Sequence, residues 1–389
     1  MSTKKVQPNT DRLVRTFLDL VQIDSPSKEE AEVAQYLMKV LKPLGVEIWQ
    51  DETGRKISGN CGNLHVRMKG SLPNAPAILF SAHLDTVMPG RGVKPRMENG
   101  IICSDGTTVL GADDKSGVAV IVEMLRVIYE QKLACGPVEV IFDVAEEIGL
   151  LGAREIDFGS LKAKCAFVLD NEELNTIVVR SPYANRMTFE VGGVAAHAGM
   201  APERGISAIE IACKAIAAMR LGRLDPDSTA NIGTFEGGRA TNIVADRVII
   251  QAEARSHSEV TLQNQTSHMQ ECFRDVLPAF RRKVGGKVIE PKFEATVIRE
   301  FDAMNIFPET LPYQLAFAAG AELGLKMESQ SIGGGTNANI YNANGLPAVV
   351  IGTGMTEEHT TSEHIAISDM EMSCCFCLEI LHQNAKSAT

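Results

Sequence analysis

Residues 77–87, Ala-Ile-Leu-Phe-Ser-Ala-His-Leu-Asp-Thr-Val, join an apolar run to a short polar tip. The run predicts a buried strand, and His83 and Asp85 stand two positions apart at its end. Because strand side chains alternate, these two lie on the same face. A neutral imidazole is a common zinc ligand, and a carboxylate that accepts its other N–H fixes the ring tautomer. A lone His-x-Asp motif is weak evidence, since a histidine at a strand end is more often structural.

Four more clusters of metal-ligand residue types follow along the chain, each beside an apolar run. Carboxylates and imidazoles are ligands for divalent cations, and one carboxylate can bridge two ions. For the first cluster, capping of the following helix is an equally good explanation. The four clusters are Asp113-Asp114, Glu146-Glu147, Asp170 and the polar loop 356–364, which contains His359, Glu363 and His364.

Paired acids at the ends of buried strands carry an electrostatic cost. Like charges in a partly desolvated crevice repel one another unless a cation neutralises them. Two imidazoles and three or more carboxylates would suit two Zn²⁺-like ions, each of which lowers the pKa of a water molecule. Because ligand sites of parallel sheets lie beyond the carboxyl ends of the strands, we expect the clusters to meet there.

The order of apolar and amphipathic segments predicts the fold. Near-continuous apolar strands that alternate with helices indicate an α/β domain with a doubly wound, mostly parallel sheet covered on both faces. The pattern occupies the first two-fifths of the chain and returns near its end. The predicted segments are helices at 10–22, 29–43, 118–128, 312–323 and from about Asp369, and strands near 77–82, 138–145, 165–169 and 348–351.

The middle of the chain, from about Met187, has a different pattern. Alternating strands and two helical stretches predict a strand-helix-strand-strand-helix-strand layer, an inserted α+β (ferredoxin-like) domain. We therefore expect residues 1–184 and 296–389 to form a discontinuous first domain and residues 185–295 to form the insertion. The predicted segments are strands at 187–191, 230–235 and 248–254, and helices at 207–221 and about 259–282.

Composition excludes several classes of partner. The 389 residues include 38 Lys+Arg and 49 Asp+Glu, a net charge of −11 that argues against binding to nucleic acid or to anionic membranes. The N-terminus lacks a signal-peptide pattern, and no run approaches the ~18 apolar residues of a membrane span. Nine cysteines, an odd count, do not suggest a disulfide framework. We expect a soluble, cytoplasmic protein.

Taken in order, the motifs resemble those of a known enzyme family, the dinuclear zinc aminopeptidases and carboxypeptidases that include aminoacylase, carboxypeptidase G and peptidase T. The resemblance extends through almost all of the chain. It is strongest to the peptidase T (tripeptidase)-like branch, because of residues 111–115 and of the aspartate at 170, where other branches place glutamate. The motifs are His83-x-Asp85-Thr86-Val87, Gly111-Ala112-Asp113-x-Lys115, Glu146-Glu147, Asp170 and His359-x-x-x-Glu363.

The resemblance implies a role for each motif residue. Asp113 would bridge the two metals, with His83 and Asp170 completing one site and Glu147 and His359 the other. We choose Asp113 over Asp114 because it follows Ala112 as in the family pattern, and His359 over His364 because of its spacing to Glu363.

Two further roles follow from the same resemblance. Asp85 would orient His83, and Glu146 would be the general base that takes a proton from the attacking water. The peptide bond after the bridging aspartate is expected to be cis.

The inserted domain resembles the lid and dimerisation domain of the family. His197, in a Gly/Ala-rich turn, would steady the oxyanion, and Asn242 and Arg255 would hold the substrate backbone and its carboxylate. A guanidinium suits a carboxylate through a bidentate fork. A homodimer through the lid domain is implied, in which the histidine reaches the partner's active site. Taken alone, a histidine in such a turn is more often a packing or surface residue.

One motif departs from the family pattern. Residues 333–339, Gly-Gly-Gly-Thr-Asn-Ala-Asn, resemble a substrate-side loop that carries an aspartate, but Asn337 stands in its place. The change removes a negative charge that could meet a substrate ammonium. A Gly-rich turn with a neutral hydrogen-bonding residue explains the segment equally well.

The leading hypothesis is a zinc-dependent hydrolase that binds two Zn²⁺ and releases the N-terminal residue of short peptides. Other divalent ions such as Co²⁺ or Mn²⁺ would fit the same ligands. One alternative is an N-acyl amino acid deacylase or a related small-amide hydrolase, and a less favoured one is a metal-free binding or assembly protein of the same fold. Side-chain preference, peptide length and the physiological metal depend on pocket shape and metal supply rather than on these motifs.

Overall fold

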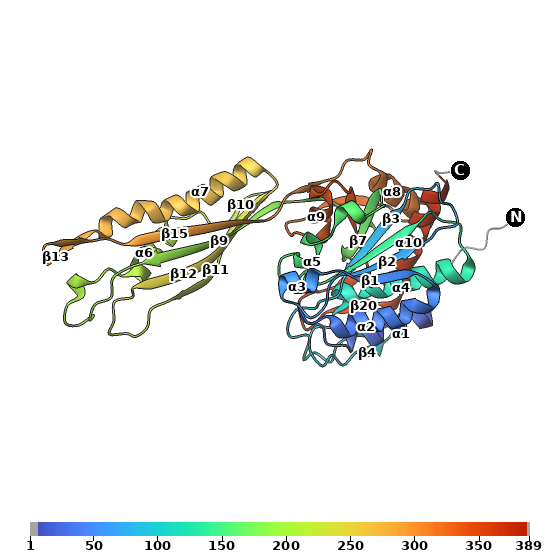
Figure 1. The fold of residues 1–389 in the computed structure, drawn as a ribbon, viewed down its shortest axis with the longest axis horizontal. Helices are drawn as coiled ribbons and strands as arrows, with labels where there is room; N and C mark the ends of the chain where they lie inside the picture. Colours follow the sequence, from blue (N-terminus) through green and yellow to red (C-terminus); the bar gives the residue numbers. More distant parts are fainter. Residues whose placement is uncertain (1–6, 387–389) are drawn as a thin grey trace. The chain divides into compact units, whose positions relative to one another are not determined.

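A computed structural model describes residues 7–386, and the chain divides into two compact units (Figure 1). The large unit comprises the residues up to Arg180, Met304–Ile332 and the residues from Thr336 onward, and the inserted unit comprises Ser181–Ala303 and Gly333–Gly335. The boundaries predicted at 184 and 295 fall inside strands β9 (Tyr183–Gly192) and β15 (Lys292–Phe301). These two strands enter and leave the insertion, and their alternating pattern begins before and continues past those positions.

The large unit is built on a mixed sheet with the strand order β1-β2-β6-β3-β7-β18-β8-β16, and β17 pairs with β8. The central pairs β6-β3, β3-β7 and β7-β18 are parallel, as is β17-β8, whereas β1-β2, β2-β6 and β18-β8 are antiparallel. The α/β fold class is confirmed, with its parallel part at the predicted apolar strands. The strands are β1 (Glu47–Gln50), β2 (Leu64–Met68), β3 (Ile78–His83), β6 (Val138–Asp143), β7 (Cys165–Asn171), β8 (Thr176–Ser181), β16 (Met304–Asn305), β17 (Glu328–Ser331) and β18 (Ala348–Gly352).

Two groups of helices pack on this sheet. In one group α4 contacts β3 and β7 and also packs against α1 and α10, and in the other α9 contacts β7 and β18 and also packs against α5. Gly117 of α4 permits a close approach to β7, because a Cβ there would lie 2.7 Å from the Leu169 carbonyl oxygen. The helices are α1 (Thr10–Val21), α2 (Ala31–Leu41), α3 (Thr53–Ile57), α4 (Ala112–Gln131), α5 (Leu151–Arg154), α8 (Leu311–Leu323), α9 (Asn337–Ala343) and α10 (Ile367–Lys386).

A small antiparallel sheet with the order β19-β20-β5-β4 also belongs to the large unit. It pairs the segment after Pro89 with the loop that carries His359, and its residues His364 and Cys103 are partners. The sheet therefore joins the loop that carries His359 to the segment between the His83 and Asp113 clusters. Its strands are β4 (Arg96–Glu98), β5 (Ile101–Cys103), β19 (Met355–Thr356) and β20 (His364–Ala366).

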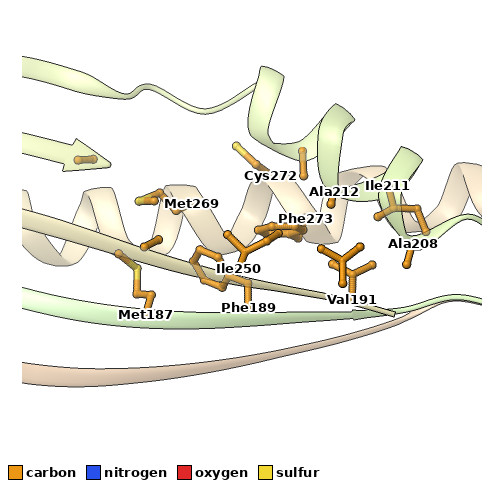
Figure 2. Close-up of a cluster of buried hydrophobic side chains, with 14 of the residues drawn as sticks. Met187, Phe189, Val191, Ala208, Ile211, Ala212, Ile250, Met269, Cys272 and Phe273 are labelled. Atoms are coloured by element: carbon orange, nitrogen blue, oxygen red, sulfur yellow. The ribbon is translucent and has the colours of Figure 1, made fainter. Parts of the chain in front are cut away.

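The inserted unit has an antiparallel sheet with the order β10-β11-β12-β9-β15 and two helices, α6 and α7, that pack on it. Apart from the short β10, the order is that of a ferredoxin-like layer, as the sequence predicts. Figure 2 shows side chains from both helices pointing toward alternate residues of β9 and β12, which form a separate hydrophobic core. The other elements are β10 (Gly222–Asp225), β11 (Ser228–Gly237), β12 (Arg247–Ser256), β13 (Arg282–Val284), β14 (Lys287–Ile289), α6 (Ala208–Ala217) and α7 (Glu259–Val276).

Among the described residues, no helix combines the length and the apolar character that crossing a membrane requires.

Candidate metal centre

The five predicted metal ligands come from five separate segments of the large unit. His83 is the last residue of β3, Asp113 lies at the start of α4, and Asp170 lies in β7. Glu147 follows β6, and His359 lies between β19 and β20. The strands β3, β6 and β7 run parallel, so their carboxyl ends lie at one edge of the sheet. The predicted convergence at the strand ends therefore has a simple topological cause.

Asp113 lies at the centre of this cluster. Its Oδ1 lies 2.9 Å from His83 Nε2, and its Oδ2 lies 3.0 Å from His359 Nε2. His359 Nε2 also lies 3.1 Å from Glu147 Oε1. Two groups of residues each have their ligand atoms within 4.8 Å of one another. The groups are His83-Asp113-Glu147 and His83-Asp114-Asp170. The structure thus brings the predicted ligands together and adds Asp114 to them.

The charges of the cluster fit a cation site. Burial, and next the charge of Asp113, raises the pKa of Asp170 to about 8, and burial also raises the pKa of Glu147. Burial acts in the same direction on Asp113, but hydrogen bonds from His359 and His83 hold its pKa below the usual range. Crowded carboxylates with imidazoles among them are the donor set that zinc-like divalent ions take. The residues therefore fit a metal centre by their chemistry.

The peptide bond between Asp113 and Asp114 is cis, as expected. Asp114 points differently from its neighbour, because its Oδ2 accepts the main-chain N–H of His83 at 3.0 Å and its Oδ1 accepts that of Gly117 at 3.2 Å. Both oxygens are thus already used in joining the end of β3 to α4. These main-chain hydrogen bonds distinguish Asp114 from Asp113, whose oxygens face imidazole rings.

Asp85 makes more contacts than the orientation of one ring requires. The His83 Nδ1 atom lies 3.0 Å from the Asp85 main-chain oxygen and 3.4 Å from Oδ1. The same fully buried carboxylate accepts the main-chain N–H groups of Glu146 at 2.9 Å and Glu147 at 3.2 Å, and the Ser27 hydroxyl at 2.6 Å. Asp85 is therefore placed to hold both the histidine and the paired glutamates.

Glu146 lies beside the ligands and is 9% exposed. Burial, together with the negative charges of Asp170, Glu147 and Asp85, raises its pKa well above the ordinary range. A carboxylate that favours its protonated form can accept a proton and return it, as a general base and acid must.

The sequence indicates Glu363 only through its spacing to His359, and the structure gives it contacts of its own. Its Oε2 accepts the N–H groups of Leu110 and Gly111, each at 2.7 Å, and its Oε1 accepts that of Asp113 at 2.9 Å. Glu363 thus fixes the turn that presents Asp113. His364, the alternative to His359, directs its Nδ1 to the Ser362 carbonyl oxygen.

The predicted substrate residues lie on both units. His197, Asn242 and Arg255 belong to the inserted unit and Asn337 to the large unit. His197 Nδ1 accepts the N–H groups of Gly199 and Met200, both at 3.2 Å, so the neutral ring carries its proton on Nε2. Arg255 forms an ion pair with Glu253 at 2.9 Å and donates to the Gly333 carbonyl at 3.2 Å. Asn337 is 1% exposed, and its Oδ1 has no hydrogen-bond partner among the described residues.

Comparison with known proteins agrees with this geometry. Residues 183–281 match the family described as "Peptidase dimerisation domain", and residues 63–177 match "Peptidase family M28". The chain is 39% identical to "Uncharacterized protein YqjE" of Bacillus subtilis, over 97% of this chain and 100% of that protein.

Two solved structures are similar over their whole length. The aminopeptidase PepT of Bacillus cereus has 38% identity and a TM-score of 0.86, and covers 97% of this chain and 99% of its own. A tripeptidase of Staphylococcus aureus has 37% identity and a TM-score of 0.90, and covers 98% of this chain and 100% of its own. Fold and site together define a metallopeptidase. The chain belongs to the peptidase T-like family, which confirms the resemblance seen in the sequence.

Proposed function

We propose that this chain is an exopeptidase that holds two Zn²⁺ and releases the N-terminal residue of short peptides. The observation that carries the proposal is Asp113, whose two oxygens face His83 and His359 within hydrogen-bond distance. The PepT and tripeptidase relatives support the choice of substrate. The alternative of a metal-free binding protein is disfavoured, because the family is one of metallopeptidases.

In this proposal Asp113 would be a ligand shared by the two ions. His83 and Asp170 would complete one site, and Glu147 and His359 the other. Asp114 is the competing ligand, since it lies within reach of His83 and Asp170. We favour Asp113 because both oxygens of Asp114 already accept main-chain N–H groups. Two bound ions would polarise the scissile carbonyl and lower the pKa of a water molecule.

The protein's own groups supply the proton transfers and the binding of the substrate. Glu146 takes a proton from the attacking water and delivers it to the leaving amine. His197 donates its Nε2–H to the developing oxyanion, a role that the hydrogen bonds to its Nδ1 support. Asn242 would bind the substrate backbone, and Arg255 would bind a peptide carboxylate.

Asn337 bears on the identity of the substrate. An aspartate there would attract the ammonium of a free N-terminus, whereas an asparagine oxygen accepts a hydrogen bond from an ammonium or from an amide N–H. The Oδ1 of Asn337, buried and without a partner in the described part of the chain, therefore keeps a second candidate open, a deacylase of N-acyl amino acids or related small amides.

We further propose a cytoplasmic homodimer that forms through the inserted unit. The match of residues 183–281 to a peptidase dimerisation domain supports the dimer. The cysteines of the chain are free thiols, which is typical of proteins from a reducing compartment.

The decisive experiment removes the base and measures metal and rate together. In Glu146→Ala we expect turnover of a tripeptide to fall by several orders of magnitude while metal content stays at the parental value, because Glu146 is not among the proposed ligands. Glu309→Ala, at an exposed acid of the same unit, is the control and should match the parent. Turnover within tenfold of the parent would remove Glu146 from its role.

A substrate panel separates the two candidate activities. Tripeptides with a free α-amine are compared with their N-acetylated forms and with N-acetyl amino acids, using the zinc-loaded protein. Hydrolysis confined to free-amine peptides supports the exopeptidase, and hydrolysis confined to the acylated compounds would replace it with the deacylase.

A further inference from the structure

The segment that carries Glu146 and Glu147 is held by side chains rather than by a strand partner. Four successive main-chain N–H groups, from Val144 to Glu147, each donate to a buried side-chain oxygen. All three acceptor side chains are fully buried and come from separate parts of the large unit. The pairs are Val144 with Asn63 at 3.1 Å, Ala145 with Glu30 at 2.9 Å, Glu146 with Asp85 at 2.9 Å and Glu147 with Asp85 at 3.2 Å.

The backbone at this point needs such support. Ala145 has a φ of 53°, in the left-handed region that residues with a Cβ rarely adopt. Its carbonyl accepts the N–H of Leu151 at 3.0 Å, and that of Glu146 accepts the N–H of Leu150 at 2.7 Å. A strained residue persists only where its surroundings fix it from several sides. At Ala145 the fixing group on the N–H side is Glu30.

Helix capping does not explain the position of Glu30. Glu30 precedes α2, but its side chain makes no capping hydrogen bond to that helix. Instead its Oε1 accepts two N–H groups, from Lys28 at 2.8 Å and from Ala145 at 2.9 Å. Its Oε2 is buried without a hydrogen-bond partner among the described residues. Burying a carboxylate is costly, so a carboxylate in this place calls for a function.

We propose that Glu30 is a positioning residue for catalysis, which sets the main chain at Ala145 and thereby aims the carboxylate of Glu146. The hydrogen bonds of Glu30 go to the main chain at Lys28 and Ala145 rather than to a proposed ligand. It acts by fixing the residue directly before the base, while Asp85 fixes the base and the ligand that follows it. This inference rests on the proposed role of Glu146.

The test uses two variants of Glu30 in the zinc-loaded protein. Glu30→Met keeps most of the side-chain volume but has no acceptor for the Ala145 N–H, and Glu30→Gln keeps an acceptor oxygen. A misplacement of about 1 Å can cost about 100-fold in rate, so we expect kcat of Glu30→Met to fall about 10- to 100-fold with little change in KM. Glu30→Gln should remain within about threefold of the parent, and Glu32→Gln, at an exposed position of α2, should match it.

Three results would overturn the proposal. The first is a kcat of Glu30→Met equal to that of the parent. The second is a loss of bound zinc in proportion to the loss of activity, which would make Glu30 a support of the Glu147 ligand instead. The third is a Glu30→Gln variant as slow as Glu30→Met, which would show that hydrogen-bond acceptance at this position is not what matters.

A double-mutant cycle tests whether Glu30 acts through Glu146. In the Glu146→Ala background no base is left to misplace, so adding Glu30→Met should change the residual rate by less than about twofold. A second loss as large as that in the parent would refute the inference. The failure of the proposed function and the failure of this inference give different results. Full activity of Glu146→Ala refutes the proposed base. Full activity of Glu30→Met beside an inactive Glu146→Ala refutes only the role of Glu30.

Discussion

At the scale of single residues, the burial of Glu30 has a consequence for stability. Burial, and next the negative charge of Asp85, raises its pKa from 4.5 to about 7. A carboxyl with a raised pKa binds its proton more tightly in the folded state than in the unfolded one. Its contribution to stability is therefore fully present below about pH 4.5 and is lost as the pH rises through 7.

The resulting prediction concerns Glu30→Gln, which cannot titrate. The free energy of unfolding of the variant, relative to the parent, should rise between pH 5 and pH 8 by about 2 kcal/mol, at about 1.4 kcal/mol per unit of pKa shift. Urea unfolding followed by fluorescence of Trp49, the one tryptophan in the sequence, measures this difference at each pH. Glu32→Gln should show no such trend, and a Glu30→Gln difference that does not vary with pH would contradict the assignment.

Sequence motifs predict the proposed metal ligands and also Asp85, which contacts His83, but they do not predict Glu30. The family pattern favours Asp113 over Asp114, and the spacing to Glu363 favours His359 over His364. In the structure Asp113 contacts both His83 and His359. Glu30 carries no comparable signal. Its partner lies 115 residues away along the chain, and it follows another glutamate that is exposed.

At the scale of elements, an aromatic cluster joins α7 to the strands β9 and β15 of the inserted unit. Phe273 of α7 is fully buried and lies beside Phe189 (Figure 2), with 5.0 Å between the two ring centroids. Its ring centroid also lies 4.7 Å from that of Phe293. Truncating such a side chain removes apolar contacts and leaves a cavity, at a cost of about 3–5 kcal/mol.

We therefore expect Phe273→Ala to speed amide exchange in β9 and β12 by about 100-fold or more, because exchange there follows opening of the unit that these strands share. Strands β3 and β7 of the large unit should exchange at the parental rate. Hydrogen exchange read by mass spectrometry resolves these segments. Val260→Ala, at an exposed position of the same helix, is the control. Equal protection of β9 in Phe273→Ala and parent would show that this core does not limit opening.

The elements that the sequence predicts are those with a strong apolar period. The apolar runs predict β3, β6, β7 and β18, and the alternating runs predict β9, β11 and β12. Among the strands without such a prediction, β4, β10, β13 and β17 are short and largely exposed, whereas β2 and β8 are largely buried and each contains an arginine, Arg67 or Arg180. Such strands are defined by a partner strand rather than by a pattern of their own.

At the scale of the whole molecule, the chain leaves the large unit after β8 and returns to it at β16. The change of pattern near Met187 indicates an insertion. Strands of a half-exposed antiparallel sheet alternate apolar and polar residues, whereas strands of a buried parallel sheet are apolar throughout. The strand pairing at the edges of the large sheet is harder to predict from the sequence than the insertion is. Antiparallel β1, β2 and β8 follow from long-range register, which composition does not encode.

The crowded carboxylates and the one tryptophan both belong to the large unit, which allows a prediction about metal removal. Asp113, Glu147 and Asp170 are crowded in the large unit, so bound cations should stabilise that unit in particular. A ligand present at about 1,000 times its Kd stabilises the folded state by about 4 kcal/mol, and at about 2–4 °C per kcal/mol we expect a chelator to lower the Tm of the large unit by about 10 °C. Trp49 belongs to this unit, so its fluorescence reports the transition directly. Zinc should restore the Tm, and Mg²⁺ should not. Asp113→Ala should abolish the response to chelator. A Trp49 transition that the chelator leaves unchanged would contradict a metal centre at these residues.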